Sequence, residues 1–201
     1  MYFLPRVRMQ PHVFRITISV IIAFFITHSF DGFSQTKKEV ASRRIESVSI
    51  STFDARRKDT TSRKNYSLYD QRGNVIESIE YDSKGNIKSH EKFEFNRNDD
   101  ETVYRSFDAD GKISRTIYTS YDKWNHVAEK STMDAQGNLS EKMISTYNVA
   151  NDLITETTTD KEGKIIHQVI YSYDNKGMML SRKIYNEKHE LIYSKEYTYQ
   201  Y

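Results

Sequence analysis

Apolar and polar residues alternate along residues 69–201, and a turn-like motif interrupts the alternation at regular intervals. The first two copies are YDQRGN from Tyr69 and YDSKGN from Tyr81. The intervals between successive copies alternate as 12, 14, 12, 14 to the end of the chain. A helical period does not produce this alternation, whereas a repeat unit of two strands and two turns does. The motif residues are Asp70, Asp82, Asn96, Asp108, Asp122, Asp134, Asn148, Asp160, Asp174 and Asn186.

Each motif predicts a five-residue turn that begins with the Asp or Asn at position 1. Position 4 holds Gly73, Gly85, Gly111, Gly137, Gly163 or Gly177 in six turns, and Asp99, Asn125, Asn151 or His189 in the other four. Glycine is the residue that best adopts a positive φ, and Asn, Asp and His are the non-glycine residues that do so most often. The pattern therefore predicts a type I turn closed by a residue in the left-handed conformation.

The turn also predicts a strand register, because positions 1 and 5 face each other in such a hairpin. Aromatic residues precede position 1 in eight of the ten motifs, and an aliphatic residue follows position 5 in nine. Aromatic and aliphatic partners stabilise antiparallel sheet. The predicted partners are Tyr81 with Ile87, Glu80 with Lys88, Ile79 with Ser89, Phe93 with Val103, and Glu91 with Arg105.

The predicted fold is all-β: an antiparallel meander of about eleven strands, built from 26-residue double-hairpin repeats. The lead-in Ile45–Phe53 reads as one more strand, followed by a charged loop. Seven charged or titratable residues are predicted in the middle of one face, and a dry interior would not accept them unpaired. We therefore expect a strongly coiled open sheet, with a closed up-and-down β-barrel as the alternative. The seven are Glu77, Glu91, Arg105, Arg115, Glu129, Glu141 and His167.

Residues 1–34 have the layout of a secretory signal peptide. Arg6, Arg8 and Arg15 precede the apolar run ITISVIIAFFIT, and only fifteen uncharged residues separate Arg15 from Asp31. That length is short of the roughly 20 residues that a membrane-spanning helix needs. We expect cleavage between Ser34 and Gln35, and export to the periplasm, the outer-membrane surface or the medium. The predicted organisation is a signal peptide (1–34), a lead-in strand and charged loop (35–68), and a repeat domain (69–201).

Composition narrows the possible partners. The predicted signal segment contains three of the 30 basic residues and one of the 28 acidic residues, so the remaining chain has 27 of each. Such a balance gives no support to nucleic-acid binding, which needs a concentrated positive surface. The chain has no cysteine. An exported product therefore has to depend on sheet pairing and burial rather than disulfides.

The motifs YDQRGN, YDSKGN, FDADGK, MDAQGN, TDKEGK and YDNKGM resemble the YD repeats of bacterial secreted and cell-surface proteins, the class that includes Rhs-type shells. The resemblance covers residues 69–201 and implies a β-rich repeat fold. YD repeats bring no catalytic residues that could be transferred to this chain. The strict alternation of shorter and longer intervals is tighter than the usual YD pattern, and an Rhs-like shell needs a much longer chain.

Candidate chemistry is sparse. Asp108 and Asp110 in FDADGK resemble half of a calcium loop, but such a site needs about 6–8 oxygen ligands and a hairpin turn explains the motif. His90, His126, His167 and His189 fall in different repeats without metal-ligand spacing. Glu77 and Glu91 face each other in the predicted register, as a glycosidase pair would, but abundant Glu makes such pairs common. We predict no metal, no cofactor and no enzyme activity.

Trp124 is the one residue that we single out for binding, because it lies in a turn at a variable position. The predicted function is a non-catalytic secreted module that binds a protein partner or a cell-envelope glycan. The alternatives are a barrel-type carrier of an apolar molecule and, third, a glycan-acting hydrolase. The C-terminal strand Leu191–Tyr201 is a predicted sheet edge that could pair with another chain.

Overall fold

The computed structural model describes residues 36–52 and 63–200. The predicted signal peptide and most of the charged loop lie outside the described residues. One helix precedes the sheet, α1 (Lys37–Ser42). No helix in the described ranges is both long and apolar enough to cross a membrane.

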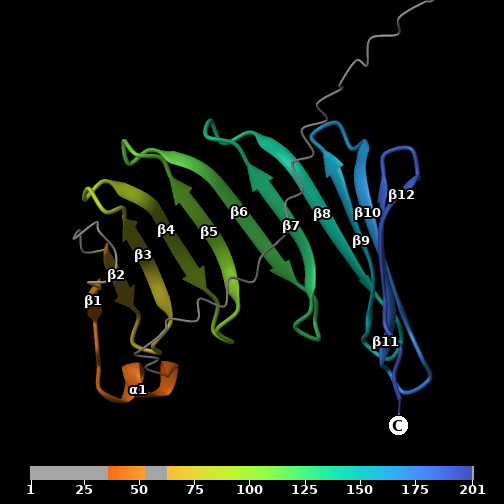
Figure 1. Ribbon diagram of the computed structural model, residues 1–201, viewed down its shortest axis with the longest axis horizontal. Helices are drawn as coiled ribbons and strands as arrows, with labels where there is room; N and C mark the ends of the chain where they lie inside the picture. Colours follow the sequence, from red (N-terminus) through yellow and green to blue (C-terminus); the bar gives the residue numbers. More distant parts are fainter. Residues whose placement is uncertain (1–35, 53–62, 201) are drawn as a thin grey trace, which may run out of the picture. The chain divides into compact units, whose positions relative to one another are not determined.

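The described strands form one antiparallel sheet in which they follow chain order from β1 to β12 (Figure 1). The first four are β1 (Ser47–Thr52), β2 (Arg63–Tyr69), β3 (Val75–Tyr81) and β4 (Ile87–Phe95). The next four are β5 (Glu101–Phe107), β6 (Ile113–Tyr121), β7 (Val127–Met133) and β8 (Leu139–Tyr147). The last four are β9 (Leu153–Asp160), β10 (Ile165–Tyr173), β11 (Met179–Asn186) and β12 (Leu191–Glu196).

The predicted all-β meander and open sheet are confirmed. Strands β1 and β12 lie at opposite ends of the strand order and each pairs with a single neighbour, so the sheet does not close. The alternative of a closed up-and-down barrel is wrong. The sheet has twelve strands rather than about eleven, because residues 63–69 form β2 and pair with β1 before the first turn.

The predicted left-handed turn position is confirmed in all ten turns. The six glycines have φ values between 77° and 86°, and Asp99, Asn125, Asn151 and His189 have values between 58° and 70°. The backbone N–H of position 1 donates to the carbonyl of position 5, as between Asp82 and Asn86 at 2.8 Å. The position 1 side chain accepts from the N–H groups of positions 3 and 5, which for Asp82 are Lys84 and Asn86.

Positions 1 and 5 are also chemically complementary through their side chains. Where position 1 is Asp, an Asn often occupies position 5 and donates its amide, as Asn86 does to Asp82 and Asn138 to Asp134. Where position 1 is Asn, position 5 is acidic, and the Asn amide of position 1 donates to the carboxylate of position 5. The reversed pairs are Asn96 with Asp100, Asn148 with Asp152, and Asn186 with Glu190.

The predicted register is correct at the first pair and wrong by one residue beyond it. Tyr81 faces Ile87, but Glu80 then faces Ser89 and Ile79 faces His90. The second residue after position 5, such as Lys88, is an extra residue that forms a β-bulge, and all ten hairpins contain this shift. Likewise Phe93 faces Tyr104 rather than Val103, and Glu91 faces Ser106 rather than Arg105. The Glu80–Lys88 contact survives as an ion pair of 3.0 Å.

The bulges redistribute the charged residues that were predicted on one face. A bulge adds one residue to one strand, and a one-residue shift exchanges the faces of all residues beyond it. Glu91, Arg115, Glu141 and His167 share a face with Tyr104, Tyr147 and Tyr171, which we call the tyrosine face. Glu77, Arg105 and Glu129 lie on the opposite face, where they pair with His90, Glu94 and Lys142.

The alternation of shorter and longer intervals has a structural origin. Strands β4, β6, β8 and β10 each have nine residues, whereas the strands that follow them have seven or eight. The longer strands extend past their neighbours. The tyrosine at the end of β6, β8 or β10 donates its hydroxyl to the carbonyl of the first residue of an adjacent shorter strand. These rim tyrosines are Tyr121, Tyr147 and Tyr173, and Tyr199 makes the same kind of bond after β12.

Helix α1 packs against the first turn of the repeat. Thr36 and Glu39 form a capping box. Val40 is buried with 1% of its surface exposed. The helix backbone lies so close to Gly73 that a Cβ there would clash with the Lys37 carbonyl oxygen. Gly73 is therefore required both by its φ of 81° and by this contact.

We predict that Gly73→Ala destabilises the protein more than Gly137→Ala. Both residues have positive φ, which costs an alanine about 1–2 kcal/mol, but only the Gly73 substitution also displaces α1 because open space surrounds Gly137. Urea unfolding of the two variants measures the difference. An equal loss of unfolding free energy in the two variants would contradict the packing of α1 on this turn.

We predict that Asp82→Asn lowers the melting temperature and that adding Asn86→Asp restores it. The single change replaces a charged acceptor by a neutral amide, whereas the double variant restores a carboxylate to the pair in the Asn–Asp order of Asn96 and Asp100. Thermal unfolding of both variants tests the complementarity. Failure of the second substitution to recover stability would contradict the complementarity of positions 1 and 5.

Acidification should destabilise the sheet. Hydrogen bonds from Asn86 hold the pKa of the Asp82 carboxyl below its usual value, and the backbone N–H of Asn138 does the same for Asp134. A lowered folded-state pKa contributes stability that is present above the unfolded value of about 3.9 and is lost as the pH falls through the folded value. The loss of these carboxylate contributions should therefore lower the melting temperature below about pH 4. A melting temperature that rises on acidification would contradict this prediction.

Candidate functional site

Five turns at one end of the strands form a row that we call the first rim. They begin at Asp70, Asn96, Asp122, Asn148 and Asp174, so that every second turn of the chain belongs to this row. The turns that begin at Asp82, Asp108, Asp134, Asp160 and Asn186 form the second rim at the opposite strand ends. Three of the four non-glycine residues at the left-handed position lie in the first rim.

Side chains connect the first three turns of the first rim. The Asp99 carboxylate accepts from Asn74 Nδ2 at 3.0 Å and pairs with Arg72 at 2.8 Å. One turn further, Asn125 Nδ2 donates to Asp100 Oδ1 at 2.8 Å. Asp99 and Asn125 both occupy the left-handed position. Their hydrogen bonds to the preceding turn offset the cost of a positive φ in a residue with a Cβ.

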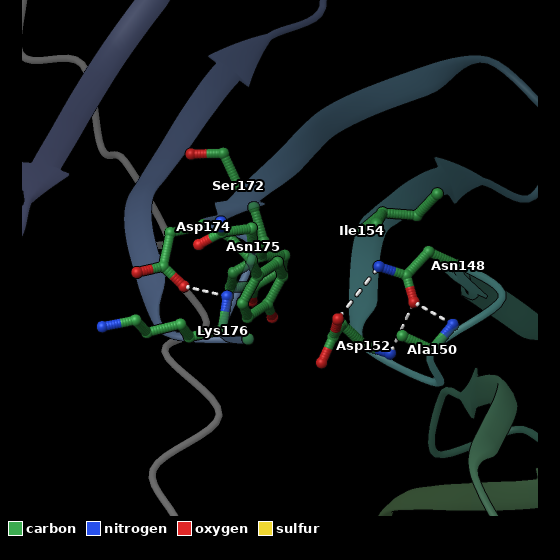
Figure 2. Close-up of a pocket in the computed structure, with 11 residues that line it drawn as sticks. Asn148, Ala150, Asp152, Ile154, Ser172, Asp174, Asn175 and Lys176 are labelled. Atoms are coloured by element: carbon green, nitrogen blue, oxygen red, sulfur yellow. Dashed lines mark hydrogen bonds between the residues drawn. The ribbon is translucent and has the colours of Figure 1, made fainter.

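An open depression of about 640 Å³ lies between the turns of Asn148 and Asp174 (Figure 2). The left-handed position of the second turn is Gly177, which has no side chain to reach Asp152 in the way that Asn125 reaches Asp100. The depression is lined by the polar residues Asn148, Asp152, Asp174, Asn175 and Lys176, together with Tyr173. The volume falls within the range of roughly 300–1,000 Å³ that is common for small-ligand sites.

The turns hold these polar side chains in fixed positions. Asn148 Oδ1 accepts from the N–H groups of Ala150 and Asp152, and its Nδ2 donates to Asp152 Oδ2 at 3.0 Å. Asp174 Oδ1 accepts from the N–H groups of Lys176 and Met178. In each carboxylate, at least one oxygen is therefore oriented by its own turn. The site offers acceptors, amide donors and one cation within a single depression.

Two tyrosines support the floor of this depression. Tyr173 donates its hydroxyl to the Leu153 carbonyl at 2.9 Å, and burial raises the pKa of Tyr173. Tyr171 donates to Glu156 Oε2 at 2.6 Å; burial and then this carboxylate raise the pKa of Tyr171 to about 12. Both hydroxyls remain protonated at neutral pH, so the rings are held in place by bonds that do not titrate.

The tyrosine face satisfies its charges through aromatic partners. Glu156 accepts from Tyr171, and the guanidinium of Arg182 lies 6.0 Å from the ring centroid of Tyr171. The same arrangement occurs five strands earlier, where Glu91 accepts from Tyr104 and Arg115 lies 5.6 Å from its ring. Half-buried charge is thus accommodated without a dry interior. Burial lowers the pKa of His167, which contacts the Thr158 hydroxyl at 3.2 Å.

Trp124, the predicted binding residue, lies on the first rim but outside the depression. It occupies the Asp122 turn, one turn before that of Asn148, and 60% of its surface is exposed. Lys123 Nζ lies 4.0 Å from the centre of a Trp124 ring. Trp124 therefore provides an exposed aromatic ring at the neighbouring turn of the same rim.

The other sequence candidates are separated by the fold. Glu77 and Glu91 do not face each other, because Glu77 is opposite Lys92 and Glu91 is on the other face. The Asp108 carboxylate accepts from the Asp110 and Lys112 N–H groups of its own turn. Among the residues that the structure describes, no group of three potential ligands is suited to a metal ion.

The four histidines have separate surroundings. His90 contacts Glu77 at 2.7 Å and stacks on Phe107, and His126 contacts Asp122 and stacks on Tyr147. His167 lies on the tyrosine face, and His189 occupies a left-handed turn position. A second depression, of about 700 Å³, lies at the second rim beside β1 and β2 and is lined by Tyr66, Tyr81 and Lys84 among others.

Sequence reasoning did not identify the residues of the first-rim depression. A signal was present, because the left-handed position changes from Asn125 and Asn151 to Gly177 within the same rim. Finding the depression from that signal required the knowledge that Asn125 bonds across to the neighbouring turn.

No family model and no curated protein matches the chain. Among solved structures, TcdB2-TccC3 is similar at a TM-score of 0.41 and 13% identity, over 74% of this chain and 10% of that chain. A porin-like protein from Bacteroides uniformis gives a TM-score of 0.37 and 12% identity, over 77% of this chain and 56% of that one. TarM from S. aureus gives a TM-score of 0.25 and 13% identity, over 77% of this chain and 22% of that one. The chain thus spans about a tenth of TcdB2-TccC3, and none of these likenesses indicates its function.

Proposed function

We propose that the protein is an exported, non-catalytic module of the YD-repeat type that binds a cell-envelope glycan at the depression of the first rim. The observation that carries this proposal is the set of oriented amide and carboxylate groups beside Tyr173. Sugars present neighbouring hydroxyl groups, each both donor and acceptor, on a ring with an apolar face. Planar amides and carboxylates match the hydroxyl groups, and an aromatic ring matches the apolar face.

The chemistry of the site supports binding rather than catalysis. The two carboxylates that line the depression, Asp152 and Asp174, accept hydrogen bonds from N–H donors of their own turns, whereas a general acid has to present a proton to the substrate. A carrier of apolar molecules would need an enclosed cavity, which the open sheet does not provide. A protein partner at the same rim remains the alternative occupant.

The sharpest test introduces the missing bridge. Gly177→Asn places at the Asp174 turn the residue that Asn125 provides two turns earlier on the same rim, where it donates to Asp100. We predict that this side chain reaches Asp152, fills the depression and lowers glycan affinity at least tenfold. Asn tolerates a positive φ better than most residues, so the variant should fold.

Gly163→Asn is the matched control, because it has the same left-handed backbone and open surroundings but lies on the second rim. Binding of residues 35–201 to an array of bacterial envelope polysaccharides identifies a ligand, and calorimetry with that polysaccharide compares the variants. Loss of binding in Gly177→Asn alone supports the proposal. Equal binding by both variants, or retention of no polysaccharide by the unaltered protein, would overturn it.

A further inference from the structure

Strand β12 ends the sheet with an exposed apolar edge. All six of its residues are exposed, including Leu191 at 53%, Ile192 at 51% and Tyr193 at 46%. The other edge strand, β1, alternates serine with other residues at Ser47, Ser49 and Ser51. Exposed apolar edge strands are templates for pairing with another strand.

The hydrogen bonds to β11 show which backbone groups of β12 face outward. Tyr197 N–H donates to the Leu180 carbonyl at 3.0 Å, and antiparallel strands alternate between hydrogen-bonded and non-hydrogen-bonded pairs. Counting back along the register, Lys195 and Tyr193 bond toward β11. The N–H and C=O groups of Ser194 and Glu196 therefore point away from the sheet.

We infer that two copies of this chain pair through β12 in antiparallel fashion, with the twofold axis at Ser194. A twofold axis normal to the sheet keeps each face continuous, so it has to pass through a residue that faces itself. Centring at Lys195 or Glu196 sets like charges opposite each other, and centring at Tyr193 sets Glu190 opposite Glu196. Like charges directly opposite each other destabilise a sheet. Of these four registers, only the one centred at Ser194 avoids such contacts.

The Ser194 register also gives each exposed side chain a suitable neighbour. Tyr193 faces Lys195 of the second copy, and Leu191 faces Tyr197, each twice because of the symmetry. Lys195 already lies 4.9 Å from the Tyr197 ring of its own chain, and it gains a second ring opposite the like-charged Arg182, its cross-strand partner. The Arg182 guanidinium already lies 5.9 Å from the Tyr193 ring on the same face, which shows that this ring accepts a cation.

A matched pair of proline variants tests the edge. Ser194→Pro removes an N–H that β11 does not use, so the fold should be retained while pairing is blocked. Ser49→Pro makes the same change at the centre of β1, where the Tyr69–Glu46 bond places Ser49 N–H outward. Sedimentation of residues 35–201 should show an average mass that rises toward twice the monomer value with concentration. Ser49→Pro should preserve this rise, and Ser194→Pro should abolish it.

A cysteine variant tests the register, since the chain has no other cysteine. In the proposed dimer the two Ser194 Cα atoms are about 5.5 Å apart, within the range of a disulfide. Mild oxidation should link Ser194→Cys into a covalent dimer and leave Glu196→Cys and Ser49→Cys monomeric. A monomer at all concentrations up to about 500 µM, which places the Kd in the millimolar range, would overturn the inference, as would equal cross-linking of the three variants. Neither outcome depends on glycan binding.

Discussion

Every hairpin of this sheet depends on one residue held at positive φ. The turn places an Asp or Asn first and the left-handed residue fourth, so that a single side-chain oxygen orients two backbone N–H groups, as Asp82 does. Where a glycine holds the fourth position, the conformation carries no steric cost. Where Asp99 or Asn125 holds it, the side chain bonds to the neighbouring turn. The same constraint therefore decides both the geometry of each hairpin and how closely adjacent hairpins are joined.

The unequal strand lengths follow from how those hairpins are joined. Each nine-residue strand extends beyond the shorter strand next to it, and the gap at the first rim receives a rim tyrosine such as Tyr147, whose hydroxyl satisfies the Val127 carbonyl. Phe95 occupies the equivalent place at the start of the series and has no hydroxyl. There the polar bonds of Arg72 and Asn74 to Asp99 join the turns instead. Near Gly177 the tyrosine bond of Tyr173 remains while the turn-to-turn side chain is missing, and the depression opens at that place.

Sequence patterns were sufficient for the strands and turns, because Asp or Asn followed at the fourth turn position by Gly, Asn, Asp or His has a direct steric meaning. They were insufficient for the register, because the extra residue of each bulge is as varied as Lys88, Thr102 and Leu180. The bulge increases the local twist of its strand and shows no residue preference at that position. The face assignments of Glu77 and Glu91 failed for that reason. The candidate site depends on contacts between turns that are separated by two full strands of sequence, which no local pattern encodes.

The charges of the tyrosine face favour an open sheet. This face carries Glu91, Glu141 and Glu156 together with Arg115 and Arg182. Closure around this face would remove water from all of these groups. The free-energy cost of desolvating so many charges exceeds the interaction energy that a Tyr hydroxyl or an aromatic ring provides. In an open sheet these side chains keep access to water beside their tyrosine neighbours. An open sheet has edge strands with unpaired backbone groups, and in β12 the N–H and C=O groups of Ser194 and Glu196 point away from the sheet. The polar face that prevents closure is thus the reason why an edge remains free to pair.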